Sequence, residues 1–245
     1  MSTTTASVTL DSLKGRILDL DSHLQLPMGG LAPFFGDLAG EIGQARARRG
    51  MGRGQAALAR NAVWERQEHP DEDNVWTVKG HNSYGANQPE ERVRVMDLMG
   101  IERQLIFPMV AVARAAWQDS EAGREALRRY NDFVIGWAAH DPQRLRPTTI
   151  LAMNDPAAAL VEAERVVSAG SRAVLLPAHH APAHRSPADA DWDPLWAFLA
   201  DSRVPALFHV GSQDGFISGE WTPSNLPATA LAGNEDEPAG PFQHA

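Results

Sequence analysis

Short apolar runs alternate with longer amphipathic stretches from residue 16 to residue 209. An apolar run of about four to eight residues is typical of a strand buried on both faces, whereas apolar positions about every three to four residues are typical of a helix. The apolar runs predict strands over residues 16–23, 103–108, 146–153, 172–177 and 204–209. The amphipathic stretches predict helices over residues 89–99, 120–139, 156–168 and 191–200. This alternation predicts an α/β protein with a parallel sheet and crossover helices.

Two segments fall outside the alternation. Residues 24–88 form a long excursion after the first strand, in which the Arg- and Ala-rich residues 41–67 could form one or two helices. Loops of this length in compact domains are usually functional or disordered. Residues 211–245 are rich in Gly, Pro, Asn and acidic residues, so we expect them to be mostly loop or disordered.

The number of predicted strands limits the architecture. A closed (β/α)₈ barrel needs eight strands and typically about 250 residues, whereas this chain has 245 residues and spends many of them on the excursion. We therefore predict a single domain over residues 1–245, of the (β/α)₈ TIM-barrel type, with about five βα units and an incomplete barrel. The edge strands of such a sheet expose unpaired backbone groups, so we expect a homo-oligomer or association through these edges.

Composition narrows the partners and the chemistry. Acidic and basic residues are interspersed with a net charge of −9, which favours neither nucleic acid nor an anionic membrane. The chain has no cysteine, so any metal must be held by His, Asp or Glu. No apolar run approaches the roughly 18 residues of a membrane span, and residues 1–12 lack the pattern of a signal peptide. We therefore expect a soluble cytoplasmic protein.

Residue types that bind metals stand at the ends of two predicted strands. Asp21 and His23 end the first strand two positions apart, which places both side chains on one face. His209 ends the fifth strand. Ligands of parallel α/β sheets bind at the carboxyl ends of the strands, so these three residues could hold one divalent ion with an open position for water. Taken alone, Asp-x-His is equally compatible with a surface turn.

Other polar residues at the same end have less specific signals. His179 and His180 follow the fourth strand and, with His184, could line a substrate pocket or belong to a loop without a chemical role. Asp19 could support the metal site or cap a neighbouring backbone amide, and a purely structural hydrogen bond is an equal alternative. Ser22 lies outside any Gly-x-Ser-x-Gly motif, so we do not assign it as a nucleophile.

Several sequence blocks occur together in a characteristic order. They cover residues 19–23, 91–92, 96–101, 107–108, 130–133, 141–142, 144–145 and 192–196, and the last block leads to His209. In this order the chain resembles the amidohydrolase-related proteins. That group includes aminocarboxymuconate-semialdehyde decarboxylase and the γ-resorcylate and 5-carboxyvanillate decarboxylases.

The resemblance implies a metal-dependent (β/α)₈ hydrolase or non-oxidative decarboxylase with one divalent ion, for which Zn²⁺ is favoured and Mn²⁺ is allowed. It maps the first-strand ligand pair onto Asp21 and His23 and the fifth-strand ligand onto His209. The best-known members carry His or Glu at the position of Asp21, and a carboxylate there makes a hard ion such as Mn²⁺ more plausible. The fourth strand contains no lysine, which argues against a carbamate-bridged two-metal centre.

The family pattern continues beyond what this chain contains. Members carry a His on a sixth strand and an Asp on the eighth, and this Asp is both a metal ligand and the acid/base group. His244 lies in a segment without a strand pattern, so the catalytic acid/base residue stays unassigned. We expect an enzyme that hydrolyses or decarboxylates a small carboxylated or carbonyl-containing organic molecule. The alternative is a catalytically silent half-barrel that binds at most a ligand or a partner.

Overall fold

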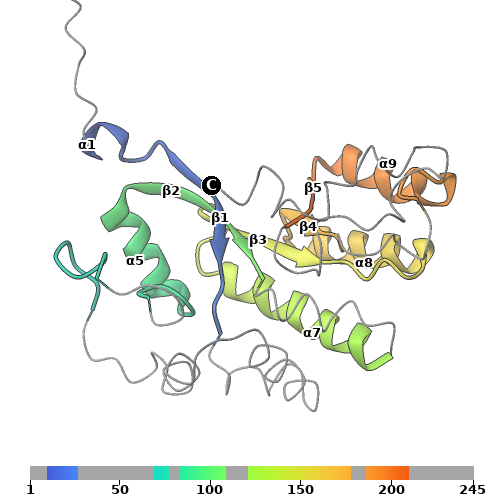
Figure 1. Ribbon diagram of the computed structural model, residues 1–245, viewed down its shortest axis with the longest axis horizontal. Coiled ribbons are helices and arrows are strands. Elements are labelled where there is room, and N and C mark those ends of the chain that lie inside the picture. Colours follow the sequence, from blue (N-terminus) through green and yellow to red (C-terminus); the bar gives the residue numbers. More distant parts are fainter. Residues whose placement is uncertain (1–9, 27–68, 78–82, 109–120, 178–185, 210–245) are drawn as a thin grey trace, which may run out of the picture.

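The computed structural model describes residues 10–26, 69–77, 83–108, 121–177 and 186–209 (Figure 1). Its strands are β1 Ile17–His23, β2 Ile101–Phe107, β3 Leu145–Ile150, β4 Ala173–Leu175 and β5 Ala206–Leu207. Its helices are α1 Leu10–Leu13, α5 Pro89–Met99, α7 Glu121–Ala138, α8 Pro156–Ala169 and α9 Asp193–Ser202, with a 3₁₀ turn, η5, over Ala190–Trp192. The helices predicted within residues 41–67 and the loop predicted over residues 211–245 lie outside the described residues.

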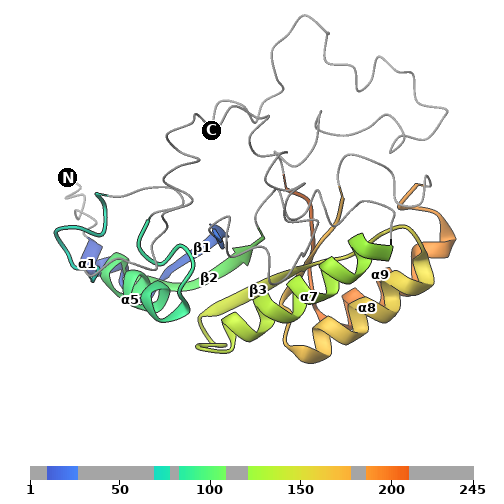
Figure 2. The ribbon, with the colours of Figure 1, turned by 90° about the horizontal axis from the view of Figure 1, so that it is seen from below.

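The five strands form one parallel sheet in the order β1-β2-β3-β4-β5. Successive strands are joined by crossovers that contain α5, α7, α8 and α9 in turn. Figure 2 shows α5, α7 and α8 on the same outer side of the curved sheet. The result is a curled half-barrel, which confirms the prediction of a (β/α)₈-type fold with five βα units.

Helix ends follow from the residues predicted to set them. Pro89 occupies the first turn of α5, where its missing N–H costs nothing. Gly100 ends that helix with a φ of 73° and donates its N–H to the carbonyls of Asp97 and Met96. At the start of α8, the side chain of Asp155 accepts the backbone N–H of Ala158. These local signals place the helices correctly to within a few residues.

The core lies between the sheet and its helices. One side of α7 is buried through side chains spaced three and four residues apart, namely Leu127, Tyr130, Val134 and Trp137. This spacing places them on a single helical stripe that packs against β3. A second apolar cluster joins β4 to α8 and α9 around the fully buried Trp192. None of the helices in the described part of the chain has the length and apolar character required to span a membrane.

The observed strands are shorter than several of the apolar runs that predicted them. β3 ends at Ile150, although Leu151 and Met153 beyond it are also buried. β5 contains only Ala206 and Leu207. After β3 burial continues past the last paired residue, because an apolar run reports burial whereas strand length is set by backbone pairing. After β5 it does not, since Phe208 is 54% exposed.

The first strand differs from its prediction as a buried strand. Leu18 and Leu20 are 58% and 68% exposed. Among the described residues β1 pairs with β2 alone, so it is an edge strand of the sheet. The apolar run correctly predicted a strand, but burial of both faces requires neighbours that the described half-barrel does not place beside β1.

Candidate metal centre

The candidate ligands on β1 follow an irregularity in its pairing with β2. Asp19 is opposite Gln104 and Ser22 is opposite Ile106, so β1 has one more residue than β2 between these pairs. Such a bulge redirects the side chains that follow it. Asp21 lies within the bulge, and its backbone N–H donates to Oδ1 of Asp19 at 3.0 Å. Asp19 therefore caps a backbone amide at the site, which was one of the roles predicted for it.

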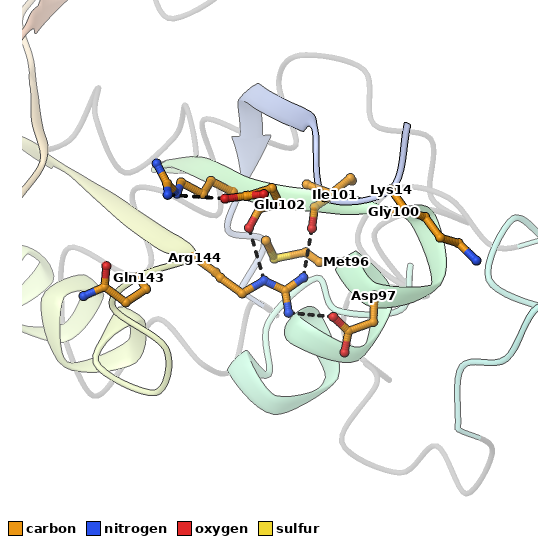
Figure 3. Close-up of a pocket in the computed structure, with 10 residues that line it drawn as sticks. Lys14, Met96, Asp97, Gly100, Ile101, Glu102, Gln143 and Arg144 are labelled. Carbon is orange, nitrogen blue, oxygen red and sulfur yellow. Dashed lines mark hydrogen bonds and ion pairs between the residues drawn. The ribbon is translucent and has the colours of Figure 1, made fainter. Parts of the chain in front are cut away.

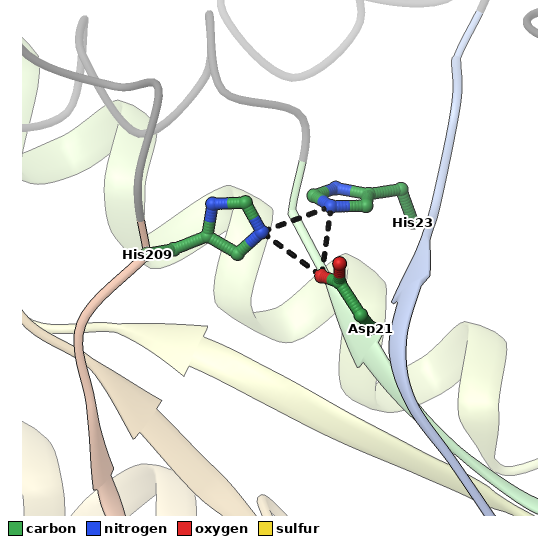
Figure 4. Close-up of side chains that lie close together, drawn as sticks. All are labelled: Asp21, His23 and His209. Carbon is green, nitrogen blue, oxygen red and sulfur yellow. Dashed lines mark hydrogen bonds and ion pairs between the residues drawn. The ribbon is translucent and has the colours of Figure 1, made fainter. Parts of the chain in front are cut away.

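Asp21, His23 and His209 come together at the carboxyl end of the sheet (Figure 4). Nε2 of His209 lies 3.0 Å from Oδ1 of Asp21 and 3.2 Å from Nε2 of His23. Nε2 of His23 lies 3.4 Å from the same Asp21 oxygen. Three potential ligand atoms thus face a common point, although His209 is 188 positions from Asp21 in the sequence.

The spacing of these atoms fits a divalent ion. For an ion about 2.1 Å from each donor, neighbouring donor atoms lie about 3.0 Å apart at right angles and about 3.4 Å apart at the tetrahedral angle. The three observed separations fall within this range. Two imidazoles and one carboxylate form a donor set that suits Zn²⁺ and also Mn²⁺. The residues present therefore fit the predicted ion, with positions left open for water or substrate.

The surroundings of His23 favour the form of its ring that binds metal. Nδ1 of His23 lies 3.2 Å from the carbonyl oxygen of Pro108, which can only accept a hydrogen bond. Nδ1 therefore carries the proton, and Nε2 directs its lone pair toward Asp21 and His209. Burial lowers the pKa of His23, and the electrostatic effect of the neighbouring His209 lowers it further. Both effects disfavour the imidazolium and leave Nε2 available as a ligand.

The cluster has an apolar inner side and an open outer side. Phe107, at the end of β2, stacks edge-on against His209 with ring centroids 4.9 Å apart and lies 5.7 Å from the ring of His23. The Asp21 side chain is 74% exposed, whereas those of His23 and His209 are 23% and 19% exposed. A small ligand can therefore approach from the Asp21 side, while the ring of Phe107 packs against both imidazoles.

The predicted substrate pocket after the fourth strand is not tested by the described residues. His179, His180 and His184 lie outside the described residues, so the pocket role remains a prediction. The described structure has a pocket of about 430 Å³, but its lining includes Gly15, Gly100 and Gln143, at the amino ends of the strands. That is the end opposite to Asp21, His23 and His209, where barrel folds do not place catalysis.

Arg92 and Gln104 were not predicted to serve the site. Both are buried: Arg92 donates to Ser22 at the end of β1, and Gln104 donates to Asp19 earlier in the same strand. Arg92 shares the buried face of α5 with Val95 and Met96, three and four residues later. An arginine on an apolar helical stripe was the available sequence signal, because such a position buries a cation that must find acceptors.

The fold and the cluster together define an α/β protein of the barrel type with potential metal ligands at the carboxyl end of its sheet. The chain belongs to the amidohydrolase family, whose profile matches residues 59–244. This match includes His209 and begins after Asp21 and His23. It confirms the family indicated by the sequence blocks.

Individual relatives agree with this assignment. The γ-resorcylate decarboxylase of a Polaromonas species is 42% identical over 78 residues, which are 32% of this chain and 24% of that protein. An amidohydrolase from Mycobacterium avium subsp. paratuberculosis has a TM-score of 0.56 at 23% identity, with 80% of this chain and 58% of that chain covered. A 5-carboxyvanillate decarboxylase from Novosphingobium aromaticivorans, solved with manganese, has a TM-score of 0.51 at 15% identity, covering 83% and 54%.

The chain spans about half the length of these structural neighbours and a quarter of the curated relative. At these identities the structural neighbours establish the fold. The neighbours are TIM-barrel amidohydrolases, which agrees with the half-barrel described above.

Proposed function

We propose that this chain holds the divalent ion of a metal-dependent carboxy-lyase, which removes carbon dioxide from a small hydroxylated aromatic carboxylate. The observation that carries the proposal is the convergence of Asp21, His23 and His209 within 3.4 Å of one another. The γ-resorcylate decarboxylase relative supports a decarboxylase over a hydrolase, since both reactions could use the same three ligands. The family membership supports an enzyme of this general kind.

The three ligand residues have distinct tasks in this proposal. His23 offers Nε2 because Pro108 fixes the proton on Nδ1, and His209 offers Nε2 from the opposite edge of the sheet. Asp21 supplies a negative charge and faces solvent, on the side where substrate enters. The bound ion would act as a Lewis acid that orients and polarises an oxygen of the substrate.

The proposed reaction needs no oxidant. The bond between the ring carbon and the carboxylate carbon breaks, and carbon dioxide leaves. The electron pair stays on the ring carbon, which takes up one proton. Phe107 excludes water from the inner side of the cluster and offers an apolar surface beside the aromatic ring of the substrate.

Either Zn²⁺ or Mn²⁺ could occupy this centre. The two imidazoles suit Zn²⁺, whereas the carboxylate and the positions open to water suit Mn²⁺. The 5-carboxyvanillate decarboxylase solved with manganese supports the second ion. We propose Mn²⁺ as the first ion to test and Zn²⁺ as its competitor.

The first prediction concerns metal content. The chain, freed of metal with a chelator and reloaded with Mn²⁺ or Zn²⁺, should bind about one ion, as an open mononuclear centre requires. Asp21→Ala, His23→Ala and His209→Ala should each lower the affinity at least about tenfold, because each removes one of three protein ligands. Equilibrium dialysis followed by elemental analysis measures both quantities.

His140→Ala is the matched control. His140 is exposed, lies between α7 and β3, and contacts Glu90 and none of the three candidate ligands, so its removal should leave metal content unchanged. Parent-like affinity in all three ligand variants would refute the centre.

With Mn²⁺ bound, release of resorcinol from 2,6-dihydroxybenzoate tests the reaction. Metal binding without turnover of any hydroxybenzoate would refute the carboxy-lyase and favour the catalytically silent half-barrel.

A further inference from the structure

A buried arginine contacts the strand that carries two of the metal ligands. Arg92 projects from α5 and is only 5% exposed. One end of its guanidinium donates to the hydroxyl of Ser22 and, at 2.8 Å, to the backbone carbonyl of His23. Its other donors bind the carbonyls of Gly85 and Ala86. The guanidinium therefore joins the end of β1 to the segment that precedes α5.

A second contact extends the reach of Arg92 to the other ligand. The guanidinium donates to Oε1 of Gln104 at 3.2 Å, and the amide nitrogen of Gln104 donates to Oδ2 of Asp19 at 2.9 Å. The other oxygen of Asp19 accepts the backbone N–H of Asp21. The positions of Asp21 and His23 are thus tied to one cation, the first through two intermediates and the second directly.

Burial of this cation has a cost that its contacts must offset. Burial lowers the pKa of Arg92 to about 10. A buried charge without acceptors is strongly destabilising, as is removal of one partner from a buried ion pair. Here every direct acceptor is a carbonyl, hydroxyl or amide oxygen at the end of β1 or beside it. The ring of Trp137 lies 5.7 Å below the guanidinium carbon.

We propose that Arg92 is a positioning residue for the metal centre, and that Gln104 transmits its effect to Asp21. The inference rests on the proposed function, because it assigns a role toward the ion held by Asp21, His23 and His209. The planar fork of arginine reaches Ser22 and the His23 carbonyl at once, which the single ammonium of lysine cannot reproduce. Loss of the fork leaves the metal-bearing end of β1 free to shift, and ligand placement sets affinity.

Arg144 provides a matched control because it performs a similar task elsewhere. It donates to the carbonyls of Glu102 and Ile101 at 3.1 and 2.9 Å and to the carboxylate of Asp97 at 2.6 Å (Figure 3). These contacts lie at the amino end of β2, away from Asp21 and His23. Removal of Arg144 should therefore reduce stability without altering the metal centre.

The test compares Mn²⁺ affinity in Arg92→Lys, Gln104→Leu and Arg144→Met. Each variant is measured at a temperature where far-UV circular dichroism shows a fully folded chain. Arg92→Lys and Gln104→Leu should bind Mn²⁺ roughly 10- to 100-fold more weakly, the usual effect of losing a residue that orients a metal ligand. Arg144→Met should bind within about twofold of the parent. The electron paramagnetic resonance spectrum of bound Mn²⁺ should broaden or shift in the first two variants alone.

Unchanged Mn²⁺ affinity and an unchanged spectrum in Arg92→Lys and Gln104→Leu would overturn the inference, as would an equal loss in Arg144→Met. If Arg92→Lys does not fold, Gln104→Leu alone decides, since its substitution conserves the size and burial of the side chain. The ligand variants separate the two proposals. If Asp21→Ala, His23→Ala and His209→Ala retain Mn²⁺, the proposed function fails; if they lose it while Arg92→Lys and Gln104→Leu keep it, only the positioning role fails.

Discussion

Three side chains at the mouth of the half-barrel present donor atoms to one another at 3.0 to 3.4 Å. Two of these atoms are imidazole nitrogens, and the Pro108 carbonyl leaves that of His23 without a proton. Close lone pairs repel unless a proton or a cation lies between them. At the scale of single residues, the site is therefore organised to receive a positive charge.

A titratable residue away from the site gives a prediction at the same scale. Tyr130 is fully buried in the core, and burial raises its pKa above the ordinary value of about 10. Above that pH the unfolded chain loses the tyrosine proton while the folded chain keeps it. The free energy of unfolding should therefore fall as the pH rises beyond about 10, and be fully retained below it.

Urea unfolding of the parent and of Tyr130→Phe from pH 8 to pH 11 measures this effect. The variant lacks the ionisable group, so its stability should fall less steeply over the alkaline part of the range. Equal slopes in both chains would contradict the prediction. The difference between the chains isolates Tyr130 from other groups that titrate at high pH, including Arg92.

Between elements, the important contact joins α5 to the end of β1. Gly85 approaches α5 so closely that a Cβ atom built on it would lie 2.8 Å from the Cα of Arg92. The residue also has a φ of +72°, a conformation that side chains other than glycine adopt with strain. Its carbonyl accepts the Arg92 Nε–H. The absence of a side chain at position 85 thus permits the arginine to reach β1.

Two glycine substitutions should have opposite effects. Gly85→Ala should lower the free energy of unfolding by about 2 kcal/mol or more, from a left-handed backbone conformation and a clash with α5. Gly136→Ala, on the exposed face of α7 with nothing near the added Cβ, should raise it by about 0.5–1 kcal/mol. Chemical denaturation of both variants measures the difference. A stable Gly85→Ala would contradict the close packing of this segment on α5.

At the scale of the molecule, the candidate metal site depends on the curl of the sheet. Among the strands that the structure describes, β1 and β5 are the two outer ones, four spacings apart. In a flat sheet with about 4.8 Å between strands, they would be separated by about 19 Å, too far for His23 and His209 to share an ion. The curvature that a barrel requires brings their side chains within 3.2 Å.

The same architecture leads to a prediction about association. In the described part of the chain β1 has no neighbour beyond β2, and it exposes Leu18 and Leu20. Such an edge can pair with another chain. We expect the isolated chain to self-associate, and Leu18→Lys combined with Leu20→Lys to shift it toward the monomer, because charges on an edge oppose pairing.

Sedimentation velocity over a range of concentrations measures this association. The control is Arg128→Lys combined with Asp132→Lys, which places two lysines at exposed positions on α7 instead of on β1. A parent chain that stays monomeric at every concentration would contradict the prediction. Equal association of the parent and the β1 variant would show that another surface is responsible.

The sequence by itself determined the order of strands and helices and the helix ends at Pro89 and Gly100, and it singled out the three candidate ligand residues. These features depend on side-chain periodicity and on backbone preferences within a few residues, which a single sequence displays directly. The ordered sequence blocks indicated the family, which the match over residues 59–244 confirmed.

Only the tertiary structure decided that Asp21, His23 and His209 meet, that β1 exposes its leucines, and that Arg92 holds the end of β1. Each depends on groups that are distant in the chain: Arg92 contacts Ser22 across 70 positions, and His209 contacts His23 across 186. The curvature of a sheet depends on how all of its strands and helices pack together. A local pattern of residues does not determine that packing, so the curvature was seen only in the tertiary structure.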